Sequence, residues 1–209
     1  MAEHSSTISE HYGTQRADEK TYTFFIPTSQ EKAMKNILIA GLLSIFPIAS
    51  FAAGFTVSST DMAEGQPLSR HQVFKGFGCD GDNIAPQLSW SGAPAGTKSF
   101  AVTAYDPDAP TGSGWWHWTV VNLPANTSSL PSGGVLPAGA VQGRTDYGQA
   151  GFGGACPPTG DKPHRYQFTV WALGVDHLPL DGGAGGAMVG YMLNANVLGK
   201  AQLTATYGR

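Results

Sequence analysis

Short apolar segments, separated by polar and glycine-rich stretches, dominate the pattern along this chain. Phe100–Tyr105 (FAVTAY) and Trp115–Val121 are almost continuously apolar, so they predict strands buried on both faces. Arg165–Leu173 alternates instead, and the alternation places one row of side chains on a common face: Tyr166, Phe168, Val170 and Ala172. Lys200–Tyr207 also alternates and predicts a strand at a sheet edge. Two shorter strands are expected, at Gly54–Ser59 and Gln87–Trp90.

Gly185–Leu198, near the C-terminus, is the segment with helical spacing. Its apolar residues fall on one stripe, which we expect to pack in the core: Met188, Tyr191, Met192, Ala195 and Leu198. Strands otherwise dominate, and no β-α-β alternation is present. The pattern therefore predicts a mainly β fold, an antiparallel β-sandwich with one late, short helix and long loops.

Composition supports a loop-rich β protein and excludes one class of function. Only 13% of the 209 residues are charged, whereas there are 28 glycines and 14 prolines. The formal net charge is −3, and the twelve basic residues form no run or stripe. A nucleic-acid-binding surface is therefore not expected.

The first 52 residues differ in character from the rest of the chain. Residues 1–33 have mixed charges and no hydrophobic period, so we predict that this extension is disordered. Residues 34–52 contain a basic start, the apolar run Ile37–Ala49 and small residues at Ser50 and Ala52, the order of a secretory signal peptide. The run is shorter than the roughly 20 residues of a membrane span. We expect cleavage after Ala52, a periplasmic domain over residues 53–209, and no stable membrane insertion.

Cys79 and Cys156 are the two cysteines, and both lie in the predicted exported domain. An oxidising compartment favours a disulfide, which in the chain-entropy model would contribute roughly 4 kcal/mol of stability. Two buried thiols remain the alternative. The acidic turn at Asp80, Asp82 and Asn83 lacks the spacing of a calcium loop, so we interpret it as structural.

Candidate chemistry centres on the segment Asp106–Asn122 (DPDAPTGSGWWHWTVVN). A strand should end at Asp106, because the proline that follows restricts the backbone of this residue. His117 is the ionisable group of the next predicted strand. A carboxylate and an imidazole would then share a small polar pocket. His164 precedes the 165–173 strand behind a proline-rich turn. For each histidine, the alternative is a hydrogen-bonded residue of the core.

Taken together, these motifs resemble the phosphatidylethanolamine-binding proteins (PEBP), and within them the bacterial branch called Raf-kinase-inhibitor-like. The resemblance rests on Asp106–Pro110 (DPDAP), Trp116–Trp118 with Val120–Asn122, and Pro157–Gly160 followed by His164–Tyr166. Gly78-Cys79, the residues of Asn83–Trp90 and Lys98–Phe100 extend it over nearly the whole predicted domain. It implies a two-sheet sandwich with a small anion pocket formed by Asp106, Ala109, His117, Pro157, His164 and Tyr166.

The residue types at these positions agree with that implication. Two imidazoles, a phenol and the backbone N–H groups of the Gly153–Cys156 loop can all donate to a phosphate or carboxylate. Asp106 would accept an imidazole hydrogen bond, and a Cys79–Cys156 bridge would fix the loop beside the pocket. The connection after the DPDAP motif is shorter than in eukaryotic members, and their C-terminal helix near the pocket is not evident, so kinase inhibition is not expected.

Two functional hypotheses follow from these residues. The first is an exported binding protein that holds a phosphate- or phosphorylethanolamine-like group, without a metal or cofactor, or that uses the pocket rim to engage and inhibit another protein. The second is an enzyme, because Asp106, His117 and His164 match a two-histidine, one-carboxylate metal site or an acid–base pair. No serine or cysteine nucleophile has an evident base partner, which favours the first.

Overall fold

The computed structural model describes residues 54–133 and 135–209, so the predictions for residues 1–52 lie outside the described part of the chain. Its main element is a five-stranded antiparallel sheet in the order β10-β9-β5-β6-β8. The strands of this sheet are β5 (Ser99–Asp106), β6 (Trp115–Pro124), β8 (Val141–Gln142), β9 (His164–Leu173) and β10 (Val197–Tyr207). The predicted strands are confirmed, including the strand end at Asp106 and the edge position of β10.

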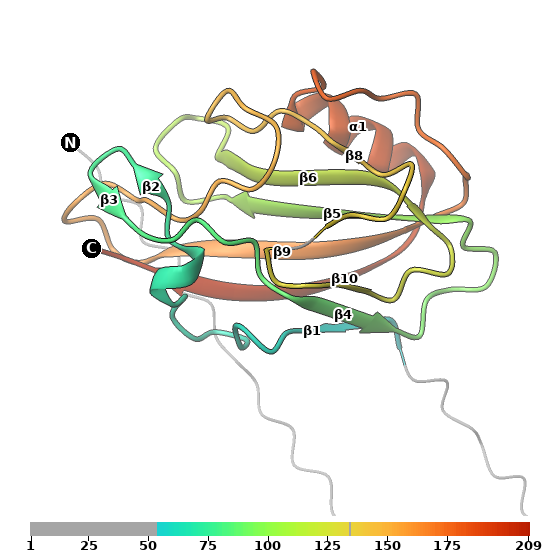
Figure 1. Ribbon diagram of the computed structural model, residues 1–209, viewed down its shortest axis with the longest axis horizontal. Helices are drawn as coiled ribbons and strands as arrows, with labels where there is room; N and C mark the ends of the chain where they lie inside the picture. Colours follow the sequence, from blue (N-terminus) through green and yellow to red (C-terminus); the bar gives the residue numbers. More distant parts are fainter. Residues whose placement is uncertain (1–53, 134) are drawn as a thin grey trace, which may run out of the picture. The chain divides into compact units, whose positions relative to one another are not determined.

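A smaller antiparallel sheet, in the order β1-β4-β7, lies against one face of the five-stranded sheet (Figure 1). The remaining elements are β1 (Thr56–Ser58), η1 (Arg70–Gln72), β2 (Lys75–Gly76), β3 (Cys79–Asp80), β4 (Leu88–Ser91), β7 (Ser129–Leu130) and α1 (Gly186–Asn196). The predicted fold class, a mainly β antiparallel sandwich with one late helix, is confirmed.

Buried side chains fill the space on both faces of the large sheet. The predicted row on β9 lies in the larger core cluster, together with Leu88 and Trp90 of β4 and Phe100 and Val102 of β5. Alternate residues of the same strands face the other way and form a second cluster with the helix: Ala101, Val121, Trp171, Leu173, Leu178, Val189 and Leu193. Because both faces of β5 and β6 are covered, these two strands are almost continuously apolar.

The predicted stripe on the helix is wrong except at Met192, which packs against the second cluster. Met188 is 55% exposed and Tyr191 is 71% exposed, whereas Gly186, Val189, Gly190 and Leu193 are the buried residues of α1. Side chains are apolar around most of this helix, so periodicity alone could not select the buried face. The contact with β6 selects it, because a Cβ atom on Gly186 would lie 2.1 Å from Cγ of Trp116.

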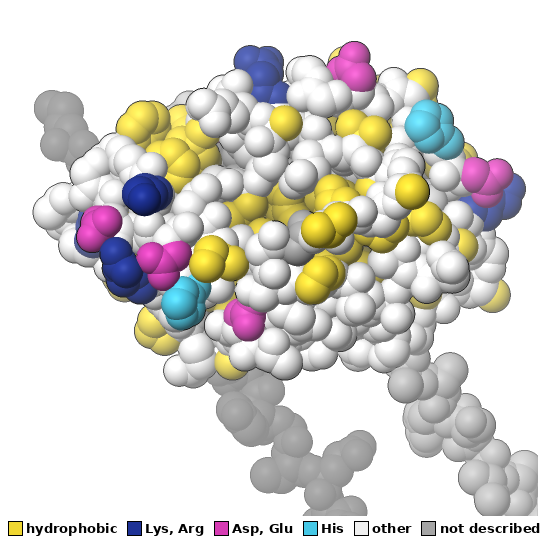
Figure 2. All heavy atoms as spheres, viewed as in Figure 1, with side chains coloured by type: hydrophobic (Ala, Val, Ile, Leu, Met, Phe, Trp, Pro, Cys, Tyr) yellow, Lys and Arg dark blue, Asp and Glu magenta, His cyan; other side chains and the backbone are white. Residues whose placement is uncertain are grey.

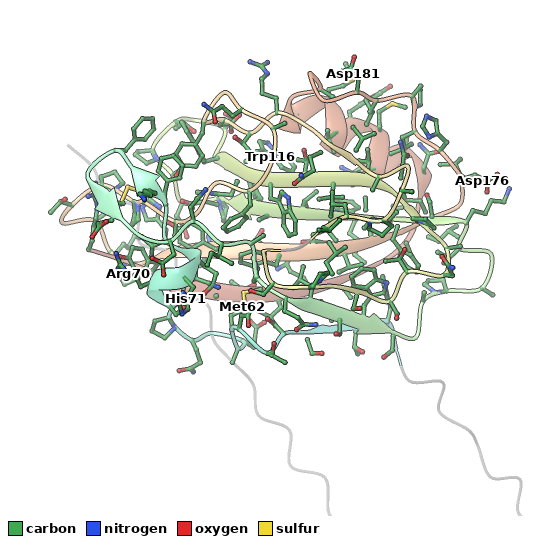
Figure 3. All side chains as sticks on the ribbon, in the orientation of Figure 1. Met62, Arg70, His71, Trp116, Asp176 and Asp181 are labelled. Carbon is green, nitrogen blue, oxygen red and sulfur yellow. A yellow bond between two sulfur atoms is a disulfide. The ribbon has the colours of Figure 1, made fainter. Side chains whose placement is uncertain are left out.

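Arg70, His71 and the acidic turn form a network of surface ion pairs. Arg70 contacts Asp80 at 3.2 Å and Asp82 at 3.0 Å, and His71 Nδ1 lies 2.8 Å from Asp82. Figure 3 shows Arg70 and His71 beside each other at η1. These contacts agree with the structural interpretation of the acidic residues.

Charge is sparse on the face shown in Figure 2, where apolar side chains gather near the middle and charged ones lie toward the margins. Within residues 54–133 and 135–209, no helix has the length and apolar character required to cross a membrane.

Candidate functional site

A cavity of about 200 Å³ lies where β5 ends and β6 and β9 begin. All the residues that the sequence singled out line it: Asp106, Ala109, His117, Pro157, His164 and Tyr166. In Figure 1 this end of the sheet also carries the β2–β3 hairpin and the C-terminus. The fold thus brings together side chains from three separate segments of the chain, and their role as ligand contacts remains a prediction.

Asp106 is 2% exposed and makes three hydrogen bonds. Its Oδ1 accepts from the backbone N–H groups of Asp108 at 2.8 Å and Ala109 at 3.1 Å, which closes the turn after β5. Its Oδ2 lies 2.7 Å from Nδ1 of His164. Asp106 therefore orients an imidazole, as the sequence predicted, and the same carboxylate shapes the loop that carries Ala109.

Asp108 connects the same loop to β9 through Arg165. Its Oδ2 accepts from both the backbone N–H and Nε of Arg165 at 2.9 Å, and its Oδ1 accepts from a terminal nitrogen at 2.7 Å. These bonds lower the pKa of the Asp108 carboxyl from 3.8 to about 2. The two aspartates of the DPDAP motif therefore pair with adjacent residues, His164 and Arg165, at the start of β9.

His117 lies at an irregularity in the pairing of β5 with β6. Ala104 pairs with Trp118 and Tyr105 pairs with Trp116, so His117 stands between these pairs without a partner on β5. Nδ1 of His117 lies 2.8 Å from the carbonyl oxygen of Gly153. Its Nε2 is buried and has no hydrogen-bond partner among the described residues. Burial lowers the pKa of His117 below 6.5, so the ring is neutral at pH 7.

His164 is 2% exposed and lies between two carboxylates. Its Nδ1 is 2.7 Å from Asp106, and its Nε2 is 3.3 Å from Asp161, whose side chain is 41% exposed. Both nitrogens of this ring are therefore engaged within the protein.

Two aromatic residues that line the cavity carry further buried polar atoms. The hydroxyl of Tyr166 and Nε1 of Trp115 are buried and, like His117 Nε2, have no partner among the described residues. The rings of Tyr166 and His117 meet edge to face, with centroids 5.1 Å apart. Burial raises the pKa of Tyr166, so its hydroxyl keeps its hydrogen and can donate. The site thus contains three polar groups that the protein itself leaves unsatisfied.

The cavity rim is held by covalent and polar contacts between the β2–β3 hairpin and the Pro157 loop. The Cys79–Cys156 disulfide joins the two segments directly. Arg209 adds a second connection, because its guanidinium donates to the carbonyls of Pro157 at 2.6 Å and Gly78 at 3.0 Å. Phe77, at the tip of the hairpin, has a left-handed backbone with φ of 53° and is 70% exposed. The rim is therefore fixed and carries an exposed aromatic ring.

The prediction that the Gly153–Cys156 backbone offers its N–H groups to an anion is wrong for three of its four residues. Gly153 N–H donates to the carbonyl of His117 and Ala155 N–H to that of Gln72, while Gly154 N–H donates to the side chain of Asn83. These bonds attach the loop to β6 and η1. The loop therefore positions the His117 ring through the Gly153 carbonyl.

Several lining residues were not predicted. They are Phe77, Pro110, Thr111, Trp115, Tyr147 and Pro158. Thr111 and Trp115 belong to the Asp106–Asn122 segment, and Pro158 follows the predicted residue Pro157. Closeness in sequence to predicted residues could therefore have identified these three. Tyr147 had no such signal, because it lies in a glycine-rich loop and reaches the site by stacking on Phe74 with ring centroids 3.9 Å apart.

The lining residues limit the chemistry of the cavity. They include one carboxylate, Asp106, and no lysine or arginine. Thr111 donates its hydroxyl hydrogen to the carbonyl of Gly114, and Cys156 is in the disulfide, so neither is placed as a nucleophile. Across the described residues, no group of three or more His, Cys, Asp or Glu side chains is arranged to hold a metal ion. The arrangement suits recognition by hydrogen bonding.

Comparison with known proteins agrees with the fold and the motifs. The family model described as phosphatidylethanolamine-binding protein matches residues 58–208. The UPF0098 protein YbcL of Escherichia coli K12 is 56% identical over 180 residues, which cover 83% of this chain and 98% of YbcL. YbhB of the same strain is 53% identical over 154 residues, 71% of this chain and 97% of YbhB. The crystal structure of E. coli YbcL superimposes with a TM-score of 0.74 at 60% identity, and the match covers 75% of this chain and 99% of that one. This chain therefore belongs to the phosphatidylethanolamine-binding protein family.

Proposed function

We propose that this domain is an exported binding protein that holds a small phosphate-like group in the cavity between Asp106, His117 and Tyr166. The observation that carries the proposal is the set of three buried polar atoms without partners: His117 Nε2, Tyr166 Oη and Trp115 Nε1. A buried polar group without a hydrogen bond costs about 1–3 kcal/mol. These three atoms expose less than 1 Å² each, so a ligand recovers that free energy once a small side-chain shift lets it reach them. All three belong to residues that line the one cavity.

The size of the cavity and the character of its rim agree with a small polar group attached to a larger molecule. About 200 Å³ accommodates a phosphate and a few further atoms. Phe77, a lining residue that is 70% exposed, provides an apolar contact for the molecule that carries the group. Such a rim also suits a protein target that presents a phosphorylated side chain.

Export is part of the proposal. Residues 34–52 have the order of a secretory signal peptide, and a disulfide between Cys79 and Cys156 persists in an oxidising compartment such as the periplasm.

Hydrolysis is less well supported than binding. Both imidazoles are engaged through Nδ1, by Gly153 and by Asp106, and the lining residues include no serine and no free thiol next to a base. Family membership points the same way, since the family is named for binding.

Calorimetric titration of the purified protein with inorganic phosphate and with phosphorylethanolamine tests the proposal. We expect binding of both, and a loss of about tenfold in affinity in Tyr166→Phe, which removes only the hydroxyl. Tyr191→Phe on the exposed face of α1 is the matched control and should bind as the wild type does. Absence of binding to either ligand, or equal affinities in the two variants, would contradict the proposal.

A further inference from the structure

We propose that Arg209 is a positioning residue for the Cys79–Cys156 disulfide, and that its guanidinium holds the two cysteine segments together before the bond forms. In this order of events the reduced chain folds first, and oxidation then closes a rim that the fold has already assembled. The inference does not depend on the proposed function, because it concerns how the disulfide arises and not what the cavity binds.

Arg209 bridges the same two segments that the disulfide joins. Its Nε donates to the carbonyl oxygen of Pro157 at 2.6 Å, and a terminal nitrogen donates to that of Gly78 at 3.0 Å. Pro157 directly follows Cys156, and Gly78 directly precedes Cys79. The guanidinium therefore spans the same gap as the disulfide, one residue away from it on each side.

The shape of a guanidinium suits this bridge. Its N–H groups lie in one plane and point in fixed directions, so a single side chain can donate to carbonyls of two segments. The second terminal nitrogen of Arg209 lies 3.4 Å from the carbonyl oxygen of Phe77. In Figure 1 the C-terminus and the β2–β3 hairpin lie at the same end of the large sheet. Because Arg209 is 52 residues from Pro157 and 131 from Gly78, these contacts require the folded chain.

The hairpin that carries Cys79 is short. β2 and β3 form two residue pairs, and an isolated two-stranded hairpin is marginally stable at best. Its base is attached through the N–H of Phe74, which donates to the carbonyl of Ala155 at 2.9 Å. Arg209 contacts the other end of the hairpin, at the turn Phe77–Gly78. Base and tip are thus held by separate hydrogen bonds, and those from Arg209 are the ones next to the cysteine.

The cores of the domain form without the two cysteines. Among the described residues, neither Cys79 nor Cys156 belongs to the two core clusters, and both are partly exposed. A reduced chain can therefore bury the same apolar side chains as the oxidised one. Partial exposure also leaves the two thiols accessible to a soluble oxidant.

The bond forms by two successive thiol–disulfide exchanges with an oxidant such as oxidised glutathione. One cysteine thiolate attacks the oxidant and releases a glutathione thiolate, which takes up the proton that the cysteine lost. The other cysteine thiolate attacks the mixed disulfide, forms the Cys79–Cys156 bond and releases the second glutathione, which is protonated in the same way. Two electrons pass to the oxidant. Arg209 acts on the second exchange, because its contacts raise the effective concentration of one cysteine at the other.

The contact and the bond favour each other reciprocally, because a coupling between two interactions acts equally in both directions. Loss of one hydrogen-bonded connection of this kind should lower the equilibrium constant for oxidation by about fivefold. The polar contact is weaker than the covalent bond, so it brings the thiols together without fixing the rim.

Equilibration of the full chain in mixtures of reduced and oxidised glutathione tests the inference, with the oxidised fraction measured by mass spectrometry after alkylation. We expect Arg209→Met to lower the equilibrium constant for oxidation, and the rate of the second exchange, by about fivefold each. Arg209→Lys keeps the charge but not the planar arrangement of donors, so it should recover part of the loss. Values for Arg209→Met within twofold of the wild type would overturn the inference.

Two controls separate positioning from a general loss of stability. Gly190→Ala, on α1, should destabilise the domain and leave the oxidation equilibrium unchanged. In concentrated guanidinium chloride the chain is unfolded, so the wild type and Arg209→Met should oxidise alike. An equal loss in Gly190→Ala, or a difference that persists in the denaturant, would overturn the role of the contact. So would a reduced wild type that is unfolded without denaturant, because the inference requires folding before oxidation.

Discussion

Asp106 and Asp108 are two residues apart, yet their different environments lead us to expect different contributions to the free energy of unfolding. Asp106 is buried and accepts from His164 and two backbone N–H groups, whereas the partner of Asp108, Arg165, has a side chain that is 55% exposed. Removing an acceptor from buried donors leaves them without partners, while an exposed ion pair contributes little in water.

We therefore expect Asp106→Ala to lower the free energy of unfolding by about 3 kcal/mol, because it leaves His164 and two amides unsatisfied. Asp108→Ala is the matched control and should cost about 1 kcal/mol or less. Urea denaturation followed by tryptophan fluorescence measures both. Similar midpoints for the two variants would contradict the distinction between a fully buried carboxylate and one in a partly exposed ion pair.

His117 should also make stability depend on pH. Burial lowers its pKa in the folded state, so below pH 6.5 the unfolded chain binds a proton at this residue that the folded protein does not. The contribution is fully present above pH 6.5 and is lost as the pH falls, by up to about 1.4 kcal/mol per pH unit. The unfolding free energy of the wild type between pH 7 and pH 5 should fall more steeply than that of His117→Gln. Parallel curves would show that His117 does not carry this dependence.

Three strands supply lining residues of the cavity, whereas helix α1 packs on the sheet and supplies none. β5, β6 and β9 supply Asp106, His117, His164 and Tyr166, and the covered faces of these strands fix their spacing. Helix α1 contributes no lining residue, but it covers the face of the sheet opposite the smaller sheet. It does so at short range through Gly186 and Gly190, which lie against the ring of Trp116 on β6.

Gly186→Ala tests that contact. Alanine favours helix by up to about 1 kcal/mol over glycine, but its Cβ would lie 2.1 Å from Trp116 Cγ, and overpacking typically costs about 1–3 kcal/mol. We expect net destabilisation of about 1–2 kcal/mol in thermal or chemical unfolding. Gly190→Ala, with a closest approach of 3.2 Å to the same ring, should cost less. A stabilised Gly186→Ala would show that helix propensity outweighs the contact.

At the scale of the whole domain, the disulfide joins the hairpin near its beginning to the loop before β9. The two cysteines are 77 residues apart, so the bond restricts a large part of the unfolded chain. It also holds one side of the cavity, since Cys156 is a lining residue. Stability and the shape of the site therefore depend on the same bond.

Reduction, or the Cys79→Ser, Cys156→Ser double variant, should lower the unfolding free energy by about 4 kcal/mol, the loop-closure value for a loop of this length. Phosphate affinity should fall as well, because the rim is released. Arg209→Met is the control: it removes the polar connection to Phe77, Gly78 and Pro157 and should cost about 1 kcal/mol. A reduced protein as stable as the oxidised one would contradict the effect on the unfolded chain.

Local patterns in the sequence determined the strands and the fold class and singled out Asp106, His117 and His164. Ala109, Pro157 and Tyr166 were implied only by the resemblance to the family. Apolar runs identify the buried strands because both sheet faces are covered, and proline after Asp106 ends β5 because it restricts the preceding residue.

Only the tertiary structure decided the features that depend on contacts between distant segments. It placed the N–H groups of Gly153, Gly154 and Ala155 in bonds to other loops, and it turned Met188 and Tyr191 of α1 toward solvent. It also set the tautomer of His117 through the carbonyl of Gly153, 36 residues away. The physical reason is the same in each case: a hydrogen bond or a close packing contact depends on which groups meet in space, and neither periodicity nor composition specifies that.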